Sequence, residues 1–207
     1  MSIEAVIWDL GGVLVRTADY APRRALAQQY GLTLEEIEDL VFSGESGDRA
    51  QLGEISVEQH WENQRNRFGL SPAELQAFRD QFWGGDRLDA DLVAYIRRLR
   101  QSYKTGLLSN AFSDLRRVVT DTWKFADAFN EMIISAEVGL VKPDPRIYHL
   151  ALERLGVAPE AAVFIDDYSR NVEGARAVRI NAIHFKDPRQ ARSDLESLLN
   201  GRVVDER

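Results

Sequence analysis

The sequence of 207 residues contains no cysteine and only three histidines. The absence of cysteine excludes disulfides, thiolate nucleophiles and cysteine zinc sites, and it is compatible with a reducing compartment. No histidine has a metal-ligand spacing to another. Any chemistry must therefore come from carboxylates, hydroxyls, amides and amines.

Long hydrophobic runs and concentrated positive charge are also lacking. No apolar run approaches the ~20 residues that a membrane-spanning helix needs. The amino terminus has neither the basic start nor the small-residue cleavage pattern of an export signal. A net charge of −7 disfavours a nucleic-acid partner, because binding phosphate backbones requires a basic surface. We therefore expect a cytoplasmic protein that binds neither nucleic acid nor membrane; the sequence does not predict its oligomeric state.

Apolar residues make up 44% of the chain, enough for a packed core. They gather in five short runs of the kind that form buried parallel strands. Helical patterns separate these runs, and alternation of strands and helices is typical of a doubly wound α/β fold with a parallel sheet. The runs cover residues 5–8, 105–108, 132–135, 162–165 and 182–185.

The segment between Leu14 and Leu88 differs, because it contains no strand-like run and instead carries three helix-start signals. Each is a capping box, with a hydroxyl residue followed three positions later by Glu or Gln. The boxes begin at Thr33, Ser56 and Ser71. We predict a core domain formed by residues 1–14 and 88–207, with an inserted helical-bundle cap over residues 15–87.

Glycines punctuate this insert. Gly44, Gly47 and Gly53 predict a loop through its middle, and Gly84-Gly85 predicts a flexible return to the core. The same glycines are equally well explained as ordinary turn residues. If they act as hinges, closure of the cap would exclude water from a pocket beneath it.

Four polar signals follow predicted strand ends in a fixed order. Asp9 ends the first run and precedes Leu10-Gly11-Gly12, and the others are Leu107-Leu108-Ser109-Asn110, Val141-Lys142-Pro143-Asp144-Pro145 and Val163-Phe164-Ile165-Asp166-Asp167. This set resembles the four motifs of the haloacid dehalogenase-like hydrolase superfamily over nearly the whole chain. The resemblance implies a Rossmann-like core and a magnesium-dependent phosphatase in which Asp9 forms an aspartyl-phosphate.

The resemblance also implies a magnesium site. Its direct ligands would be the carboxylates of Asp9 and Asp167 and the backbone carbonyl of Gly11, since Mg²⁺ prefers oxygen ligands. Asp166 and Asn171 would lie in the outer layer, holding a metal-bound water or a carboxylate. Without Asp9, the acidic pair would be read as a simple helix cap.

Three further residues are candidates for contact with a phosphoryl group. Ser109 can donate its hydroxyl, and Asn110 its backbone or side-chain amide, to a phosphate oxygen. Lys142, held between an apolar run and two prolines, can place an ammonium beside Asp9. Each residue taken alone would be read as a helix cap or an exposed side chain.

Gly11 departs from the family pattern. Phosphatases of this superfamily usually carry there a second aspartate that acts as general acid and base. Loss of such a group typically costs about 10²–10⁴ in rate. Relatives that begin Asp-Leu-Gly-Gly or Asp-Leu-Gly-Asn, including sugar-1-phosphate phosphatases, are nevertheless active. Candidates to replace the aspartate are His60, Asp19, Arg16 and Asp48.

The sequence favours a phosphatase of small phosphomonoesters, sugar phosphates among them, over three alternatives. A 2-haloacid dehalogenase resembles the Ser109-Asn110-Ala111 stretch, but it needs no metal and usually has an aromatic residue at position 11. A signalling receiver domain carries its acidic pair early and its lysine late, the reverse of this order. A noncatalytic binding protein is suggested only by Gly11.

Overall fold

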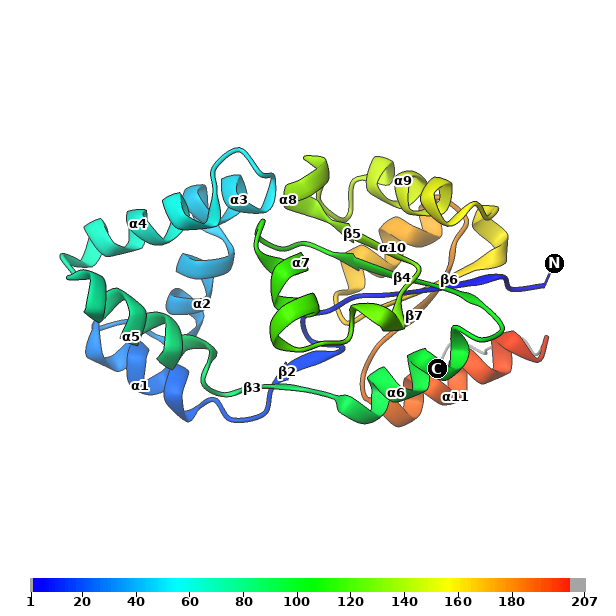
Figure 1. The fold of residues 1–207 in the computed structure, drawn as a ribbon, viewed down its shortest axis with the longest axis horizontal. Helices are drawn as coiled ribbons and strands as arrows, with labels where there is room; N and C mark the ends of the chain where they lie inside the picture. Colours follow the sequence, from blue (N-terminus) through cyan, green and yellow to red (C-terminus); the bar gives the residue numbers. More distant parts are fainter. Residues whose placement is uncertain (1, 202–207) are drawn as a thin grey trace.

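The computed structural model describes residues 2–201, which form a parallel five-stranded sheet and surrounding helices (Figure 1). The sheet order is β5-β4-β1-β6-β7, so β1 lies at the centre and the chain builds outward from it in both directions. This is the predicted doubly wound α/β fold. The strands are β1 (Ala5–Trp8), β4 (Lys104–Ser109), β5 (Glu131–Ile134), β6 (Ala162–Asp166) and β7 (Asn181–His184).

Helices cover both faces of the sheet. Val6 and Trp8 of β1 pack in one hydrophobic cluster with side chains of α6 and α11, whereas Ala5 and Ile7 pack on the other face against α9 and α10. Full burial of a side chain such as Ile7 contributes about 1.5–3 kcal/mol, so this central strand is strongly held. The covering helices are α6 (Ala90–Leu99), α9 (Pro145–Leu155), α10 (Ser169–Ala177) and α11 (Pro188–Leu199).

Short helical turns connect these elements at the edge of the sheet that carries β5. They are α7 (Leu115–Arg117), followed by a π-helical turn at Val118–Thr122 and a 3₁₀ turn at Ala126–Ala128, then α8 (Ser135–Val138). A second 3₁₀ turn, at Pro159–Ala161, lies at the opposite edge, where Asn181 of β7 donates to the Glu160 carbonyl. No helix within residues 2–201 is long and apolar enough to cross a membrane.

Five helices lie between β1 and α6 in the chain and pack around their own hydrophobic cluster. All three predicted capping boxes are confirmed, with the hydroxyl and the Glu or Gln side chain exchanging hydrogen bonds in each. The helices are α1 (Ala21–Gln29), α2 (Leu34–Phe42), α3 (Gly44–Gln51), α4 (Val57–Phe68) and α5 (Pro72–Trp83). We refer to them together as the helical insert.

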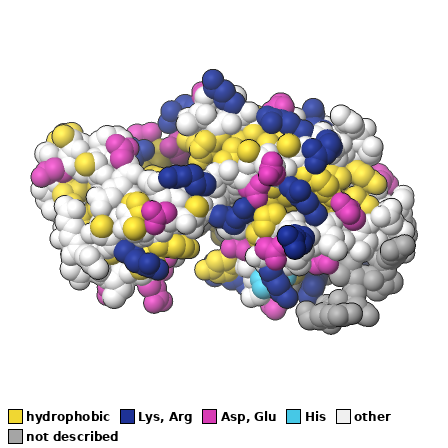
Figure 2. Space-filling model, turned by 90° about the horizontal axis from the view of Figure 1, so that it is seen from below, with side chains coloured by type: hydrophobic (Ala, Val, Ile, Leu, Met, Phe, Trp, Pro, Cys, Tyr) yellow, Lys and Arg dark blue, Asp and Glu magenta, His cyan; other side chains and the backbone are white. Residues whose placement is uncertain are grey.

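A two-stranded antiparallel ribbon, β2 (Val15–Thr17) with β3 (Asp86–Leu88), joins the helical insert to the rest of the chain. The expectation that residues 15–87 contain no strand was therefore wrong. The two strands were missed because each has only three residues and a polar sequence without an apolar run. Seen from below, the outline of the molecule narrows between the insert and the sheet (Figure 2).

Arg23 fastens the insert to this ribbon. Its guanidinium lies 3.0 Å from Asp86 of β3 and 2.6 Å from Glu38 of α2, and its Nε donates to the Phe82 carbonyl. The side chain is only 4% exposed, so its charge is satisfied by these partners rather than by water. Removal of one partner from a buried ion pair is strongly destabilising, which makes Arg23 a structural residue.

The bounds of several elements differ from those predicted from the sequence. Gly44 and Gly47 begin helix α3 rather than forming a loop, because Gly44, at a φ of +68°, turns the chain directly from α2 into α3. Ser135 begins α8 rather than ending a strand, and β7 begins and ends one residue earlier than expected. The boundaries of the two predicted domains stay a prediction.

Candidate active site

Asp9 lies directly after β1, at the carboxyl edge of the sheet. Its backbone N–H donates to the Ile165 carbonyl of β6 over 2.9 Å, so the residue continues the pairing of β1 with β6. β4 flanks β1 on the other side and ends at Ser109. The strand order therefore brings the first, second and fourth predicted motifs to one edge, where ligands bind in open α/β sheets.

Lys142 lies between two carboxylates. Its Nζ is 2.8 Å from Asp9 Oδ1 and 2.6 Å from Asp166 Oδ2, and its side chain is 1% exposed. Burial alone would lower the pKa of Lys142, but the negative charges of Asp9 and Asp166 outweigh burial and raise it above its ordinary value. The lysine is therefore a fixed cation beside the candidate nucleophile.

Asn110 holds the lysine loop in place. The Lys142 backbone N–H donates to Asn110 Oδ1 over 2.7 Å, and Asn110 Nδ2 donates to the Lys142 carbonyl over 3.0 Å. This reciprocal pair links the second and third predicted motifs. The Asn110 side chain, one of the two groups expected to contact phosphate, is thus engaged with the protein, whereas the backbone amide is not used by this pair.

Asp166 is completely buried and fully bonded. Tyr168 N–H donates to its Oδ1 over 2.7 Å, Asn171 Nδ2 lies 3.1 Å from both oxygens, and Lys142 occupies Oδ2. These partners leave Asp166 orienting its neighbours; its place in the outer layer of a metal site stays a prediction. Asn171 Oδ1 is a buried acceptor with no partner among the described residues.

Asp167 approaches the loop after β1 very closely. Gly12 has a φ of +74°, and a Cβ at that position would lie 1.9 Å from Asp167 Oδ2. Only glycine accommodates both the left-handed backbone and this contact. The role of Gly12 was missed, although the second glycine of the Gly11-Gly12 pair was the available signal. In contrast, a Cβ at Gly11 would meet no atom within 4 Å.

Oxygens of Asp9, Asp166 and Asp167 lie within 4.8 Å of one another. Burial and the charges of Asp166 and Asp167 raise the pKa of Asp9 to about 7, even though Lys142 opposes that shift. Burial and the charge of Asp166 also raise the pKa of Asp167. Three carboxylates share one ammonium, so the group attracts a further cation.

The donor set fits magnesium. Carboxylate oxygens are the ligands that this ion prefers, and it usually retains bound water. The unpartnered Asn171 Oδ1 supplies an acceptor for such a water, while Asp9 and Asp167 supply carboxylate oxygens that lie close to one another. The Gly11 backbone carbonyl, two residues after Asp9, is the third predicted metal ligand and stays a prediction.

Ser109 is the last residue of β4 and is 3% exposed. Its hydroxyl has no hydrogen-bond partner within residues 2–201, so it is available to a ligand. The next residues are fixed by Ser135, because Ala111 N–H donates to Ser135 Oγ over 2.9 Å and the same hydroxyl donates to the Ala111 carbonyl. Ser135 was missed because a serine at a strand end carries no distinctive signal.

The four candidate replacements for the absent second aspartate have different surroundings. Arg16 is paired with Asp89 at 2.6 Å in the ribbon, and Asp19 Oδ1 accepts from Ala21 N–H at the start of α1. Asp48 is exposed on α3. His60 is completely buried in the first turn of α4, next to Phe112 in the loop after β4. We refer to the parallel sheet, its covering helices and their loops as the sheet domain.

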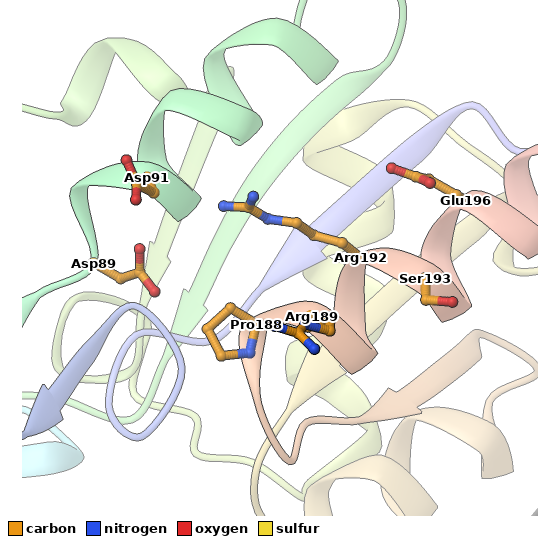
Figure 3. Close-up of a pocket in the computed structure, with 7 residues that line it drawn as sticks. All are labelled: Asp89, Asp91, Pro188, Arg189, Arg192, Ser193 and Glu196. Carbon is orange, nitrogen blue, oxygen red and sulfur yellow. The ribbon is translucent and has the colours of Figure 1, made fainter.

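A surface hollow lies elsewhere, between α6 and α11 (Figure 3). Its lining mixes both charges, and Asp89 there is already paired with Arg16. It shares no residue with the Asp9, Lys142 and Asp166 group, so we do not assign the reaction to it. Its lining residues are Asp89, Asp91, Pro188, Arg189, Arg192, Ser193 and Glu196.

Comparison with known proteins identifies the family. The model of the haloacid dehalogenase-like hydrolases matches residues 3–179, and the chain belongs to this hydrolase family. The chain is 29% identical over 188 residues to phosphorylated carbohydrates phosphatase of Thermotoga maritima, with 88% of this chain and 84% of that protein covered.

Two further comparisons extend this result. The chain is 27% identical over 219 residues to acyl-CoA dehydrogenase family member 10 of Mus musculus, covering 96% of this chain but only 19% of that protein. A HAD family enzyme of Bacteroides thetaiotaomicron, solved with magnesium and inorganic phosphate, superposes with a TM-score of 0.76 at 22% identity, covering 90% of this chain and 96% of that one. This last similarity supports the fold.

Proposed function

We propose that the protein is a magnesium-dependent phosphatase of small phosphomonoesters, with Asp9 as the nucleophile. The arrangement that carries this proposal is the Lys142 ammonium held at 2.8 Å from Asp9 and 2.6 Å from Asp166, beside a cation-attracting carboxylate group. The phosphatase relative from Thermotoga maritima supports the substrate class.

In the proposed reaction, an Asp9 carboxylate oxygen attacks phosphorus, and the bond from phosphorus to the ester oxygen breaks. The leaving oxygen takes its proton from water, because Gly11 supplies no general acid. A second water molecule then hydrolyses the aspartyl-phosphate, which regenerates Asp9 and releases phosphate. Bound magnesium would reduce the repulsion between the carboxylate and the phosphate.

This chain's own groups would stabilise the transferring phosphoryl group. The Lys142 ammonium is already fixed by two carboxylates and the Lys142 backbone by Asn110, so little reorganisation is needed when negative charge develops. The free Ser109 hydroxyl would donate to a phosphate oxygen. Asp166 would act indirectly, by holding Lys142 and Asn171.

The test is phosphate release from a panel of phosphomonoesters, including sugar phosphates, with magnesium and with a chelator. We expect release that depends on magnesium. Halide release from 2-chloropropionate is measured in parallel, and halide release that ignores the chelator would favour a dehalogenase instead. Magnesium binding with no turnover on either panel would favour a noncatalytic binding protein.

Gly11→Asp is expected to raise turnover on substrates with poor leaving groups, by about 10-fold or more, because it supplies a general acid. The backbone accepts a side chain here, since a Cβ at Gly11 would meet no atom within 4 Å and the glycine does not have a positive φ. Turnover on substrates with good leaving groups should rise less. Steady-state rates measured on both classes of substrate test this difference.

Gly11→Asn is the matched control, because it has nearly the same shape but no acidic proton. Equal gains from Asp and Asn, or no preference for poor leaving groups, would contradict the idea that position 11 lacks an acid. Gly12→Ala provides a second comparison: we expect it to lose activity, because its Cβ collides with Asp167.

A further inference from the structure

Phe112 belongs to the sheet domain by sequence but packs with the helical insert. It follows Ser109 by three residues, in the loop after β4, and it is 9% exposed. Its side chain is part of the hydrophobic cluster of the insert, together with Trp61 and Phe78. The loop that carries the candidate phosphate-binding residues is therefore held by the insert through this ring.

His60 of α4 is the partner of Phe112. The two ring centroids are 4.8 Å apart with an interplanar angle of 34°, and Trp61 packs against the imidazole from another side. A second contact lies nearby, where Gly53 meets α8 so closely that a Cβ would be 2.1 Å from the Ala136 carbonyl oxygen. The insert thus docks on two neighbouring loops of the sheet domain.

These two loops are joined to each other and to the site. Ser135, next to Ala136, exchanges hydrogen bonds with the backbone of Ala111, next to Phe112. Asn110, the next residue toward β4, holds the backbone of Lys142. A displacement of the insert would therefore reach Ser109 and Lys142 through a short run of packed and hydrogen-bonded residues.

One atom weakens the docked arrangement. His60 Nδ1 lies 2.9 Å from Ser46 Oγ, but His60 Nε2 is buried with no partner among the described residues. Leaving such a group buried and unpaired destabilises the docked arrangement. Burial lowers the pKa of His60 and the charge of Arg79 lowers it further, so the ring is neutral at pH 7. An apolar ring at this position would pack on Phe112 without the penalty.

We propose that Phe112 and His60 are positioning residues that couple docking of the helical insert to the placement of the Ser109 loop, and that the unpaired His60 Nε2 keeps this docking reversible. The proposal rests on the proposed function for its kinetic consequences. Its structural consequence, a change in the mobility of the Ser109 loop, is independent of any substrate.

Two substitutions should act in opposite directions. Phe112→Ala removes the ring that the insert holds, so we expect KM to rise, kcat/KM to fall by about 10-fold or more, and backbone amides at 109–112 to exchange faster with solvent. His60→Phe removes the unpaired atom but keeps a ring, so we expect slower exchange, a lower KM and a lower kcat, because reopening then limits product release.

Hydrogen exchange by mass spectrometry and steady-state kinetics are measured on the full chain. Phe112→Leu should restore part of the loss. Trp83→Ala is the control, because Trp83 is an aromatic residue of the insert that packs on Phe42 and Phe82 within the insert. Trp83→Ala should leave exchange at 109–112 unchanged.

Unchanged exchange at 109–112 in Phe112→Ala would overturn the coupling. Parallel losses of activity and stability in both variants would overturn the role of His60, since they indicate ordinary packing. Absence of turnover in the wild-type protein would refute the proposed function alone, and the exchange data would still decide whether docking controls the Ser109 loop.

Discussion

Asp9→Asn is expected to abolish turnover and to make the metal-free protein more stable at neutral and alkaline pH. The substitution removes the nucleophile, so phosphate release should fall by at least about 10⁴-fold, as for loss of other covalent catalytic groups. It also removes a buried carboxylate whose ionisation the fold disfavours, because burial and two neighbouring carboxylates raise the pKa of Asp9 to about 7.

The pH dependence of this stabilisation follows from the direction of the pKa shift. The folded state holds the Asp9 proton more tightly than the unfolded state, whose carboxyl has a pKa of 3.8. Ionisation therefore costs no stability below pH 3.8, an increasing amount up to about pH 7, and a constant amount above that. We expect a gain in Asp9→Asn at pH 8 on the order of 4 kcal/mol, or about 8–16 °C in Tm.

Thermal unfolding in chelator at pH 4 and pH 8 measures this effect. Magnesium should raise the Tm of the wild-type protein but have little effect on Asp9→Asn, because one proposed ligand is lost. Asp91→Asn, at an exposed position, is the control and should change neither property. Substantial residual turnover in Asp9→Asn would show that Asp9 is not the nucleophile.

Lys142→Met should have the largest combined effect on activity and stability. It leaves the buried carboxylates of Asp9 and Asp166 without their shared cation. Breaking a buried ion pair in this way costs about 3–5 kcal/mol. Loss of a positioned cation beside the reacting phosphoryl group should in addition lower kcat by about 10²–10³-fold.

The loss of stability in Lys142→Met should grow as pH rises, because the Asp9 carboxyl, whose pKa burial already raises, then loses a proton that the fold would retain. Denaturant unfolding at pH 5 and pH 8 measures it, with Lys186→Met as an exposed control. A double variant with Asp9→Asn should recover part of the stability but no activity. A variant as stable as the wild type at pH 8 would contradict the electrostatic account of this site.

Much of the fold was predictable, because buried strands and capped helices leave strong local patterns. Ala5–Trp8 is a continuous apolar run, the pattern expected of a strand covered on both faces, and the structure buries all of β1. The Thr33, Ser56 and Ser71 boxes were equally clear, because each satisfies backbone donors within four residues. The ribbon of β2 and β3 was missed because its pairing joins residues about 70 positions apart.

The candidate site was predictable only for the residues that belong to the four motifs, which are recognised by their order along the chain. Asp9, Ser109 and the acidic pair lie at the ends of parallel strands, which meet at one edge of the sheet, whereas Lys142 was predicted to follow a strand and instead lies in the loop between α8 and α9. The pairing of Asn110 with the Lys142 backbone and the contact of Phe112 with His60 depend on tertiary packing. Neither involves a local sequence pattern, so the sequence could not predict them.

The ribbon that carries the helical insert has an architectural consequence. Its two strands leave the sheet domain side by side, with Val15 opposite Leu88, and Gly85 passes so close to Asp19 that a Cβ would lie 1.8 Å from its carbonyl oxygen. The whole helical insert is thus covalently connected to the sheet domain at one place. The insert is in this sense an exchangeable module: a bundle of another size or shape can be grafted onto the same two adjacent ends without changing the order of a single strand in the sheet.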